Sequence, residues 1–480
     1  NSLTNEVKEL QGVENQTTTS TSTNYALISY VGRINYDYAQ KYLISASIRR
    51  DGGSRFGPDN KWGTFTSLSL GWRVSEESFM NNLTAVSDLK LRASYGETGN
   101  DRIGDYVYQA TINSNLFYNF DDNLLTGSTI SALANADLKW ETTIMKNIGM
   151  DLGLFNDQFS LSLEWYENTT EGMILGVPIP PSLGYDGAPV ANVGTVKNTG
   201  FEITAGYELK SGDFQMGIDG NMAFVNNELT SLGTGNTIFG PTFQGDAMTL
   251  TEEGQPIAYF YGWIADGIFQ SGEDTSQQPD ASAGDIKFRD INDDGVIDAN
   301  DRTNLGHYLP DFSYGVNVNA SYKGFDFTMF WQGVSGNEIF NNLRYHTEGM
   351  TRLFGASDVV LDRWTPTNTD TNVPRAISGD PNRNARASSR FVEDGSYLRL
   401  KNISIGYSIP SSILNTWSKG NVSKVRVYLS AQNLFTITDY TGYDPEIAAR
   451  TGINSSLGTG IDYGQFPAAR TIMGGIQLAF

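Results

Sequence analysis

Residues 290–301 carry a pattern that suits a metal ion. Oxygen-bearing side chains recur at alternate residues, Gly295 permits a sharp turn, and an acidic residue closes the segment. A calcium ion takes roughly six to eight oxygen ligands from carboxylates, amides and backbone carbonyls. The sequence therefore predicts a structural Ca²⁺ that stiffens this segment, with the ligands Asp290, Asn292, Asp294, the carbonyl of Val296, Asp298 and Asp301.

The segment departs from the usual calcium loop at its last position. Asp301 stands where such loops carry Glu. Its shorter side chain makes closure of the ion shell by two carboxylate oxygens harder, and no flanking helices are evident. The alternative interpretation is a solvated acidic turn without a metal.

The remaining residues give no pattern for catalysis, and we expect a protein that is not an enzyme. The chain has no Cys, which excludes thiol chemistry, disulfides and Cys-ligated zinc. His307 and His346 each lack a partner at metal-ligand spacing, and the glycine-rich runs 233–240 and 458–464 do not match the dinucleotide-binding pattern. Carboxylate pairs for glycoside hydrolysis stay open, because any acidic chain offers them.

Composition narrows the class of protein. The 480 residues include 33 Lys and Arg against 54 Asp and Glu, a net charge of −21, which argues against nucleic-acid binding because that needs a basic face. No stretch approaches the roughly 20 consecutive apolar residues of a membrane helix. A hydrophobic fraction of 39% with 51 Gly, 24 Tyr and 25 Phe suits a thin-walled β structure. The chain begins at Asn1 without Met, so we expect it to be part of a longer precursor.

Apolar and polar residues alternate along most of the chain, which is the period of a β-strand. In 159–165, for example, Phe159, Leu161, Leu163 and Trp165 alternate with Ser160, Ser162 and Glu164. Leu163 is therefore expected to face lipid and Ser162 the lumen. The same alternation recurs in the segments 25–38, 42–49, 67–74, 89–96, 201–209, 214–222 and 312–322.

The apolar faces often end in aromatic residues, and the opposite faces carry Ser, Asn, Thr, Gly and charged residues. An apolar band with aromatic girdles and a polar lumen is typical of an outer-membrane barrel. A soluble β-sandwich or propeller also alternates and is the alternative. The long apolar faces favour an all-β, transmembrane antiparallel β-barrel with long external loops.

Connection lengths support the barrel, because such barrels alternate short periplasmic turns with long external loops. Short turns are expected at 39–40, 155–157, 210–212 and 323–324. The long external loops are predicted at 98–139, 169–196, 227–311, 335–395 and 437–468. If a strand within 256–269 crossed the membrane, the tight turn Lys323-Gly324 would lie on the external side, among the long loops. We therefore predict that this strand does not span the membrane. About 13 spanning strands result, with the C-terminus in the periplasm and the long loops extracellular.

Several segments together resemble one family. They are Gly254–Trp263, Asp266–Phe269, Gly284–Phe288, Leu309–Gly315, Tyr322–Phe327, Ser389–Asn402, Ala431–Phe435, Tyr440–Pro445 and Arg470-Thr471. This series, in this order over nearly the whole chain, resembles the C-terminal half of SusC/RagA-type TonB-dependent outer-membrane transporters of Bacteroidota. The final residues, apolar at alternate positions to Phe480, resemble the signal by which barrel C-termini are recognised for assembly.

The resemblance implies a 22-stranded barrel, filled by an N-terminal plug domain that is absent from 1–480. It implies import of oligosaccharides or peptides, a SusD-like surface lipoprotein as lid, and energy from the TonB complex through the missing N-terminal part. An odd number of strands upstream fits, because about 13 strands cannot close a barrel of even strand number.

Two other functions remain open at this point. One is a lidless TonB-dependent siderophore or vitamin transporter, and the other is a structural or adhesive outer-membrane barrel. The predicted loops carry many aromatic rings that suit sugar or peptide binding, although rings also fill the loops' own cores. None is singled out as a substrate residue; the rings are Phe117, Tyr118, Phe120, Tyr185, Phe239, Phe243, Tyr345 and Phe354.

Overall fold

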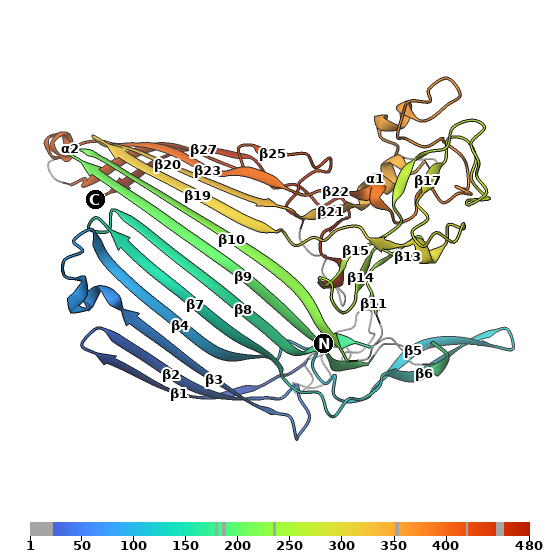
Figure 1. Cartoon of the computed structure of the whole chain (residues 1–480), viewed down its shortest axis with the longest axis horizontal. Coiled ribbons are helices and arrows are strands. Elements are labelled where there is room, and N and C mark those ends of the chain that lie inside the picture. Colours follow the sequence, from blue (N-terminus) through green and yellow to red (C-terminus); the bar gives the residue numbers. More distant parts are fainter. Residues whose placement is uncertain are drawn as a thin grey trace, which may run out of the picture.

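The computed structural model describes residues 23–177, 181–184, 189–233, 237–350, 355–418, 421–447 and 456–480. Its main element is one antiparallel sheet in which thirteen long strands follow each other in chain order, as Figure 1 shows. The strands are β1 (Leu27–Tyr38), β2 (Tyr42–Gly53), β3 (Trp62–Arg73), β4 (Val86–Asn100), β7 (Glu141–Leu154), β8 (Phe159–Gly176), β9 (Val190–Ser211), β10 (Phe214–Leu232), β19 (Phe312–Tyr322), β20 (Phe325–Ser335), β23 (Tyr397–Ser408), β24 (Lys424–Gln432) and β27 (Thr471–Ala479). The predicted all-β fold and strand number are confirmed.

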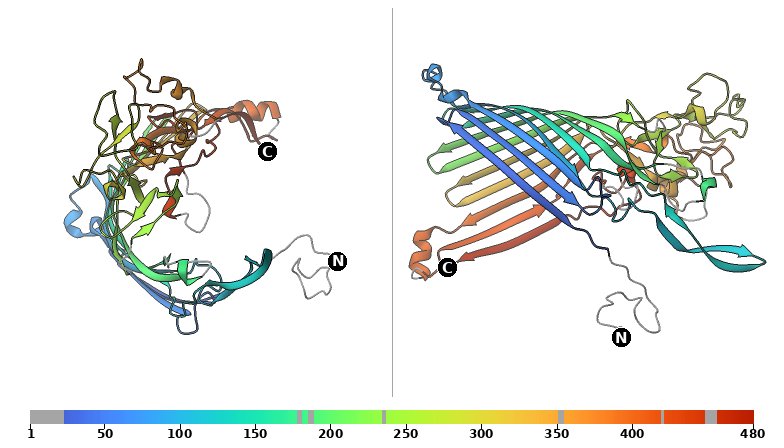
Figure 2. Two further views of the ribbon diagram at one scale, coloured as in Figure 1. Left: turned by 90° about the vertical axis from the view of Figure 1, so that its right-hand side faces the viewer. Right: turned by 90° about the horizontal axis from the view of Figure 1, so that it is seen from below.

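The sheet bends into an arc that does not close on itself (Figure 2). Its edges are β1 and β27, at opposite ends of the strand order. A short strand, β25 (Thr436–Thr438), continues the pairing of β23 where β24 ends.

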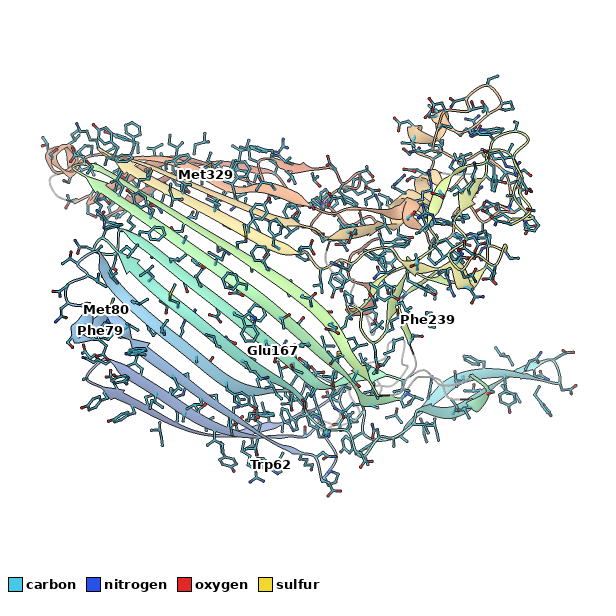
Figure 3. All side chains as sticks on the ribbon, in the orientation of Figure 1. Trp62, Phe79, Met80, Glu167, Phe239 and Met329 are labelled. Atoms are coloured by element: carbon cyan, nitrogen blue, oxygen red, sulfur yellow. The ribbon has the colours of Figure 1, made fainter. Side chains whose placement is uncertain are left out.

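Connections differ at the two ends of the sheet, which we call the turn end and the loop end. At the turn end, residues with positive φ make tight reversals: Ala39 and Gln40 after β1, and Lys323 with Gly324 after β19. Positive φ gives hairpin turns a twist that matches the strands. Figure 3 shows Phe79 and Met80 at the turn end and Phe239 among the loops at the other end.

Two α-helices occur in segments whose residues show no helical spacing. They are α1 (Asn342–Glu348) and α2 (Ser411–Ser418), and seven short 3₁₀ helices accompany them in the described residues. Helices this short show too few turns for a period of 3.6 residues to be recognised. The 3₁₀ helices are η2 (Val74–Glu76), η3 (Ser78–Met80), η4 (Pro181–Leu183), η5 (Ala299–Asp301), η6 (Asp358–Asp362), η7 (Ser389–Phe391) and η8 (Ser456–Gly458).

Several strands run further toward the loop end than the predicted spans. β8 continues to Gly176 and β9 begins at Val190, so their connection is shorter than 169–196. A separate hairpin of β5 (Thr111–Phe120) and β6 (Asn123–Ala132) lies between β4 and β7 and projects beyond the sheet (Figure 1).

The residues between β10 and β19 stay outside the large sheet, because β10 pairs directly with β19. Within 256–269, β15 (Tyr259–Gly262) joins a small four-stranded sheet instead. We call the described residues of 233–311, 336–396 and 433–470 the cap. Its further strands are β11 (Ile238–Phe239), β12 (Thr242–Phe243), β13 (Asp246–Ala247), β14 (Thr249–Thr251), β16 (Ala265–Ile268), β17 (Ile286–Phe288), β18 (Thr303–Asn304), β21 (Glu338–Asn341), β22 (Val392–Asp394) and β26 (Ile461–Asp462).

Candidate functional site

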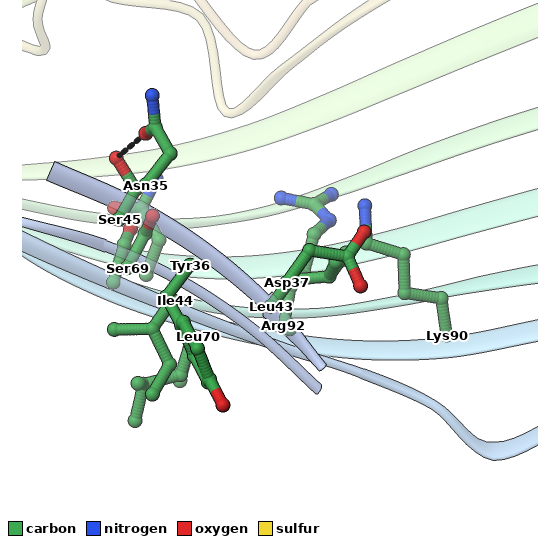
Figure 4. Close-up of a pocket in the computed structure, with 14 residues that line it drawn as sticks. Asn35, Tyr36, Asp37, Leu43, Ile44, Ser45, Ser69, Leu70, Lys90 and Arg92 are labelled. Carbon is green, nitrogen blue, oxygen red and sulfur yellow. Dashed lines mark hydrogen bonds between the residues drawn. The ribbon is translucent and has the colours of Figure 1, made fainter. Parts of the chain in front are cut away.

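The large sheet presents one apolar and one polar face. On β1, Ile34 is 74% exposed, and Tyr36 and Tyr38 are more than half exposed on the same face. Figure 4 shows Tyr36, Ile44 and Leu70 on one side of the strands and Asn35 on the other, where it accepts a hydrogen bond from Ser45 (2.8 Å). An apolar face this exposed suits contact with lipid, and the polar face then lines the lumen.

Aromatic side chains lie at both ends of the apolar face. Near the turn end, Tyr38 and Tyr42 lie side by side with ring centroids 6.4 Å apart, and Tyr42 is the cross-strand neighbour of Trp72. Toward the loop end, Tyr30 stacks on Trp62 at 6.0 Å. Two belts with an apolar band between them are the girdles expected at the two membrane interfaces.

Charged residues on the polar face of β4, β7 and β8 form one network. Arg92 pairs with Glu164 and lies 3.4 Å from Asp151, and Asn147 donates a hydrogen bond to Glu164 (2.7 Å). Gly149 lies opposite Arg92, where a Cβ would come within 2.6 Å of the guanidinium carbon. Lys90 and Arg92 also line the hollow drawn in Figure 4, which has a volume of about 540 Å³.

The cap has its own hydrophobic core. All three loops of the cap contribute to it, and we call them the first loop (233–311), the second loop (336–396) and the third loop (433–470). Met248 and Phe260 come from the first loop, Phe340 and Phe391 from the second, and Ile461 from the third, and each is at most 1% exposed. β21 pairs with β26, so the second and third loops are also joined through their backbones. The loops are therefore one packed unit.

A second cluster fixes the cap to the wall of the sheet. Val196 of β9 and Leu229 of β10 pack with Ile238, Ala258 and Leu457 of the cap. Burial of these side chains gives the cap a fixed position relative to β9 and β10.

Largely buried ion pairs hold the second loop together. Arg344 of α1 pairs with Glu348 (2.8 Å) and Glu393 (3.0 Å), and Arg390 pairs with Glu348 (3.2 Å). Burial, followed by the nearby charge of Arg344, lowers the pKa of Arg390 to about 10. Arg344 and Arg390 therefore keep their charge at neutral pH.

Arg399 of β23 anchors the third loop. It is 3% exposed, pairs with Asp444 (2.5 Å) and Glu446, and donates to Thr436 (2.7 Å). On β20, Gln332 lies opposite Arg399, and Phe330 lies opposite Asn317. Because Phe330 and Gln332 are two residues apart, Arg399 and Asn317 are on the same face of the sheet, which is the polar face. The segment 444–446 is therefore held on the lumenal side of the wall.

The predicted calcium ligands lie on one turn of the cap. Asp290 accepts backbone N–H bonds from Gly295 (2.8 Å) and Asp294 (3.3 Å), and Asn292 accepts one from Asp294 (3.1 Å). Asp301 is fully buried and binds the N–H groups of Ile291 (2.9 Å) and Asp298 (2.7 Å). Asp301 thus closes the loop through the backbone. In the described ranges, no three His, Asp or Glu side chains are grouped as a metal site would require.

The predicted aromatic rings fall into two groups. Phe117, Tyr118 and Phe120 are exposed on the β5–β6 hairpin, and Phe239 is 51% exposed. In contrast, Tyr345 is buried and lies edge-on to Phe243, with centroids 3.9 Å apart, so this pair belongs to the cap's core. Tyr185 and Phe354 lie outside the described residues.

The two histidines lie in the cap and serve its packing. The Nδ1 of His307 is 2.7 Å from the carbonyl of Leu309, and His346 lies edge-on to Tyr345. Sequence reasoning missed the Arg399 anchor, because Arg399 and its acidic partners are 45 and 47 residues apart and form no local pattern. In the part of the chain that the structure covers, no helix has the length and apolarity needed to cross a membrane.

The sequence is similar to known proteins with this architecture. Residues 2–434 match the family model for the TonB dependent receptor-like β-barrel. The chain is 35% identical over 465 residues to TonB-dependent receptor P3 of Formosa agariphila, covering 95% of this chain and 45% of that protein. It is 30% identical to TonB-dependent receptor SusC of Bacteroides thetaiotaomicron, covering 96% of this chain and 44% of that protein.

A solved structure agrees with these relatives. A chain of the RagAB peptide transporter superposes with a TM-score of 0.80 at 29% identity, covering 97% of this chain and 49% of that one. The chain thus spans about half the length of the proteins it matches, and those proteins are receptors and transporters rather than enzymes. The chain belongs to the TonB-dependent receptor family of outer-membrane β-barrels, and within that family to the SusC/RagA type.

Proposed function

We propose that the protein containing this chain imports large nutrients, oligosaccharides or peptides, across the outer membrane. The observation that carries the proposal is the packed cap at the loop end of a polar-lined half-barrel, together with the similarity to the RagAB peptide transporter. In this proposal the loop end is extracellular, the C-terminus is periplasmic, and the TonB complex acts through a part of the protein beyond these residues. A SusD-like surface lipoprotein would cover the cap.

The partners can be tested in the native membrane. We expect affinity purification of the whole protein from the outer membrane to recover, by mass spectrometry, a plug-bearing chain and a surface lipoprotein in near-equal amounts. Recovery of the plug without a lipoprotein would contradict the lid and favour a lidless transporter. Recovery of a barrel without any plug would contradict import. Uptake of labelled oligosaccharides and peptides by deletion and complemented strains then separates the two cargo classes.

We also propose that residues 290–301 bind a structural Ca²⁺ with the ligand set predicted from the sequence, which requires these side chains to turn from the backbone N–H groups that they accept toward one ion. Asp294→Asn should weaken calcium binding by about tenfold or more, because it removes the negative charge of one ligand. It should also speed proteolytic cleavage within 290–301 in the presence of Ca²⁺. Isothermal titration with Ca²⁺, and limited proteolysis followed by mass spectrometry, measure the two effects on the whole protein.

The matched control is Asp293→Asn, which removes the same charge from a residue outside the ligand set. Asn also tolerates the positive φ (58°) at this position. The Ca²⁺ proposal would be contradicted if the unsubstituted protein showed no heat of binding and both variants were cleaved equally. The segment 290–301 would then be a solvated acidic turn.

A further inference from the structure

The cap contains a cavity of about 270 Å³ between α1, the β12–β13 turn and the segment 379–386. Its polar lining comes from Gln244, Tyr345, Asp380, Arg383 and Arg386. Gln244 donates a hydrogen bond to the hydroxyl of Tyr345. Tyr345 as a whole is 3% exposed. The cavity is therefore lined by a hydrogen-bonded Gln–Tyr pair and by two arginines, Arg383 and Arg386.

Arg386 is held without an acidic partner. Its guanidinium lies over the rings of Phe288 (4.3 Å) and Trp263 (5.0 Å), and it donates to the carbonyls of Asn382 (2.6 Å) and Arg383 (3.1 Å). Within the described ranges, no carboxylate lies within ion-pair distance of it. Such a half-buried cation is costly unless a counter-ion reaches it.

The acidic residues nearby are already engaged. Asp246 pairs with Arg383. The two carboxylate oxygens of Asp380 accept the N–H groups of Asn384 (2.8 Å) and Ala385 (3.0 Å). Burial, followed by the charge of Arg383, lowers the pKa of Arg386 to about 10, although Asp246 and Asp380 oppose the shift. The charge of Arg386 is thus the least compensated one at the cavity.

The backbone around the cavity is shaped in advance. Asp380 and Arg383 have positive φ (41° and 53°), a conformation that L residues rarely adopt, whereas the positive φ of Gln244 (51°) is that of the β12–β13 hairpin turn. Non-glycine residues keep such conformations only where the surroundings fix them, and they cluster at ligand sites. The surroundings therefore fix the backbone of the segment 379–386 at the cavity.

We propose that this cavity binds one anionic group of the imported cargo, a carboxylate or a sulfate, with Arg386 as its main partner. A guanidinium binds both groups through two parallel N–H donors. At about 270 Å³ the cavity admits one sugar unit or side chain, not a whole oligomer. This inference rests on the proposed function and narrows its cargo to acidic sugars or acidic peptides.

The test compares charged probes with neutral twins on the whole transporter with its partners. The pairs are tetragalacturonate and its methyl ester, a sulfated galactan tetrasaccharide and its desulfated form, and a Glu-containing tetrapeptide and its Gln form. We expect at least one charged probe to bind about tenfold or more tightly than its twin by isothermal titration calorimetry. The pair that responds identifies the source of the anionic group.

Arg386→Met keeps the contacts with Phe288 and Trp263 and removes the charge, so it should abolish the preference while the neutral twin binds as before. Arg302→Met is the control, because Arg302 also lies over Trp263 (5.3 Å) but does not line the cavity. If Arg386→Met does not fold, Arg386→Lys should still lose at least about threefold of the preference, since Lys cannot bind through a planar fork.

Equal affinities within every pair, or an unchanged preference in Arg386→Met, would overturn the inference while leaving import intact. An unchanged preference in Arg386→Lys would overturn it where Arg386→Met does not fold. Absence of binding by all six probes would overturn the inference, and absence of uptake by the cells as well would overturn the proposed function.

Discussion

Replacing Arg399 by Met should release the segment 444–446 from the lumenal side of the sheet. Arg399 is buried between Asp444 and Glu446, and its removal leaves the buried Asp444 without its cationic partner. Breaking a buried pair by removing one member costs about 3–5 kcal/mol. Lys401 stays near Glu446 (2.5 Å) but is not paired with Asp444, so it compensates only one of the two carboxylates.

Limited proteolysis and hydrogen exchange of the whole protein measure this release. Cleavage in 437–468 should accelerate strongly, while the peptides of β7 to β10 keep their protection. Arg33→Met is the control, because Arg33 is exposed on the polar face of β1. Equal protection of 437–468 in both variants would mean that the third loop is held by its apolar contacts alone.

The same contact gives the wild-type loop a dependence on acid. Burial alone would raise the pKa of Asp444, but the hydrogen bond from Arg399 and those from the N–H groups of Ala468 and Glu446 outweigh it, and the pKa is lowered. A lowered folded-state pKa adds stability above the unfolded value of about 3.9 and loses it as the pH falls through the folded value. Proteolysis of the wild-type loop should therefore rise below about pH 4, whereas Arg399→Met is cleaved readily at every pH.

The large sheet could be predicted from the sequence because one of its faces contacts lipid and the other contacts water. Each spanning segment alternates in polarity, so thirteen strands are recognisable one at a time. The prediction stopped short where this contrast ends. Beyond Trp165, β8 continues through Glu167, Asn168 and Thr169, which are polar on both faces, although they remain paired with β9. Backbone hydrogen bonds extend the strand there, and they leave no trace in the polarity pattern.

The cap could not be predicted in the same way, because its contacts join residues far apart in the chain. Phe260, Phe340 and Ile461 meet in one core although no local period connects them. Arg386 lies among Asp380, Arg383 and Arg390 in the sequence, and only the fold shows that it lacks an acidic partner. The aromatic count pointed to the loops as a whole and did not separate core rings such as Tyr345 from exposed rings such as Phe117.

Replacing Leu163 by Arg should destabilise the barrel by about 2–4 kcal/mol. Leu163 lies on the apolar face of β8 beside Met150 and Ile203, between Phe159 and Trp165 at the borders of the apolar band. A guanidinium there would have to leave water for hydrocarbon or bend toward an interface. The unfolding midpoint of the whole protein in lipid vesicles, read from its heat-modifiable mobility, gives the size of the effect.

Ser162 is the adjacent residue on the polar face, but it donates to Asp151 (2.8 Å) and accepts from Arg92 (3.3 Å), so an Arg there would disturb the charged network. Thr204 is the better control, because it is exposed, lies opposite Ser162 on β9 and has no part in that network. Thr204→Arg should change stability by less than about 0.5 kcal/mol. A shift of one residue in strand register exchanges the two faces, so equal losses in both variants would contradict the assignment of lipid and lumen on which the transport proposal depends.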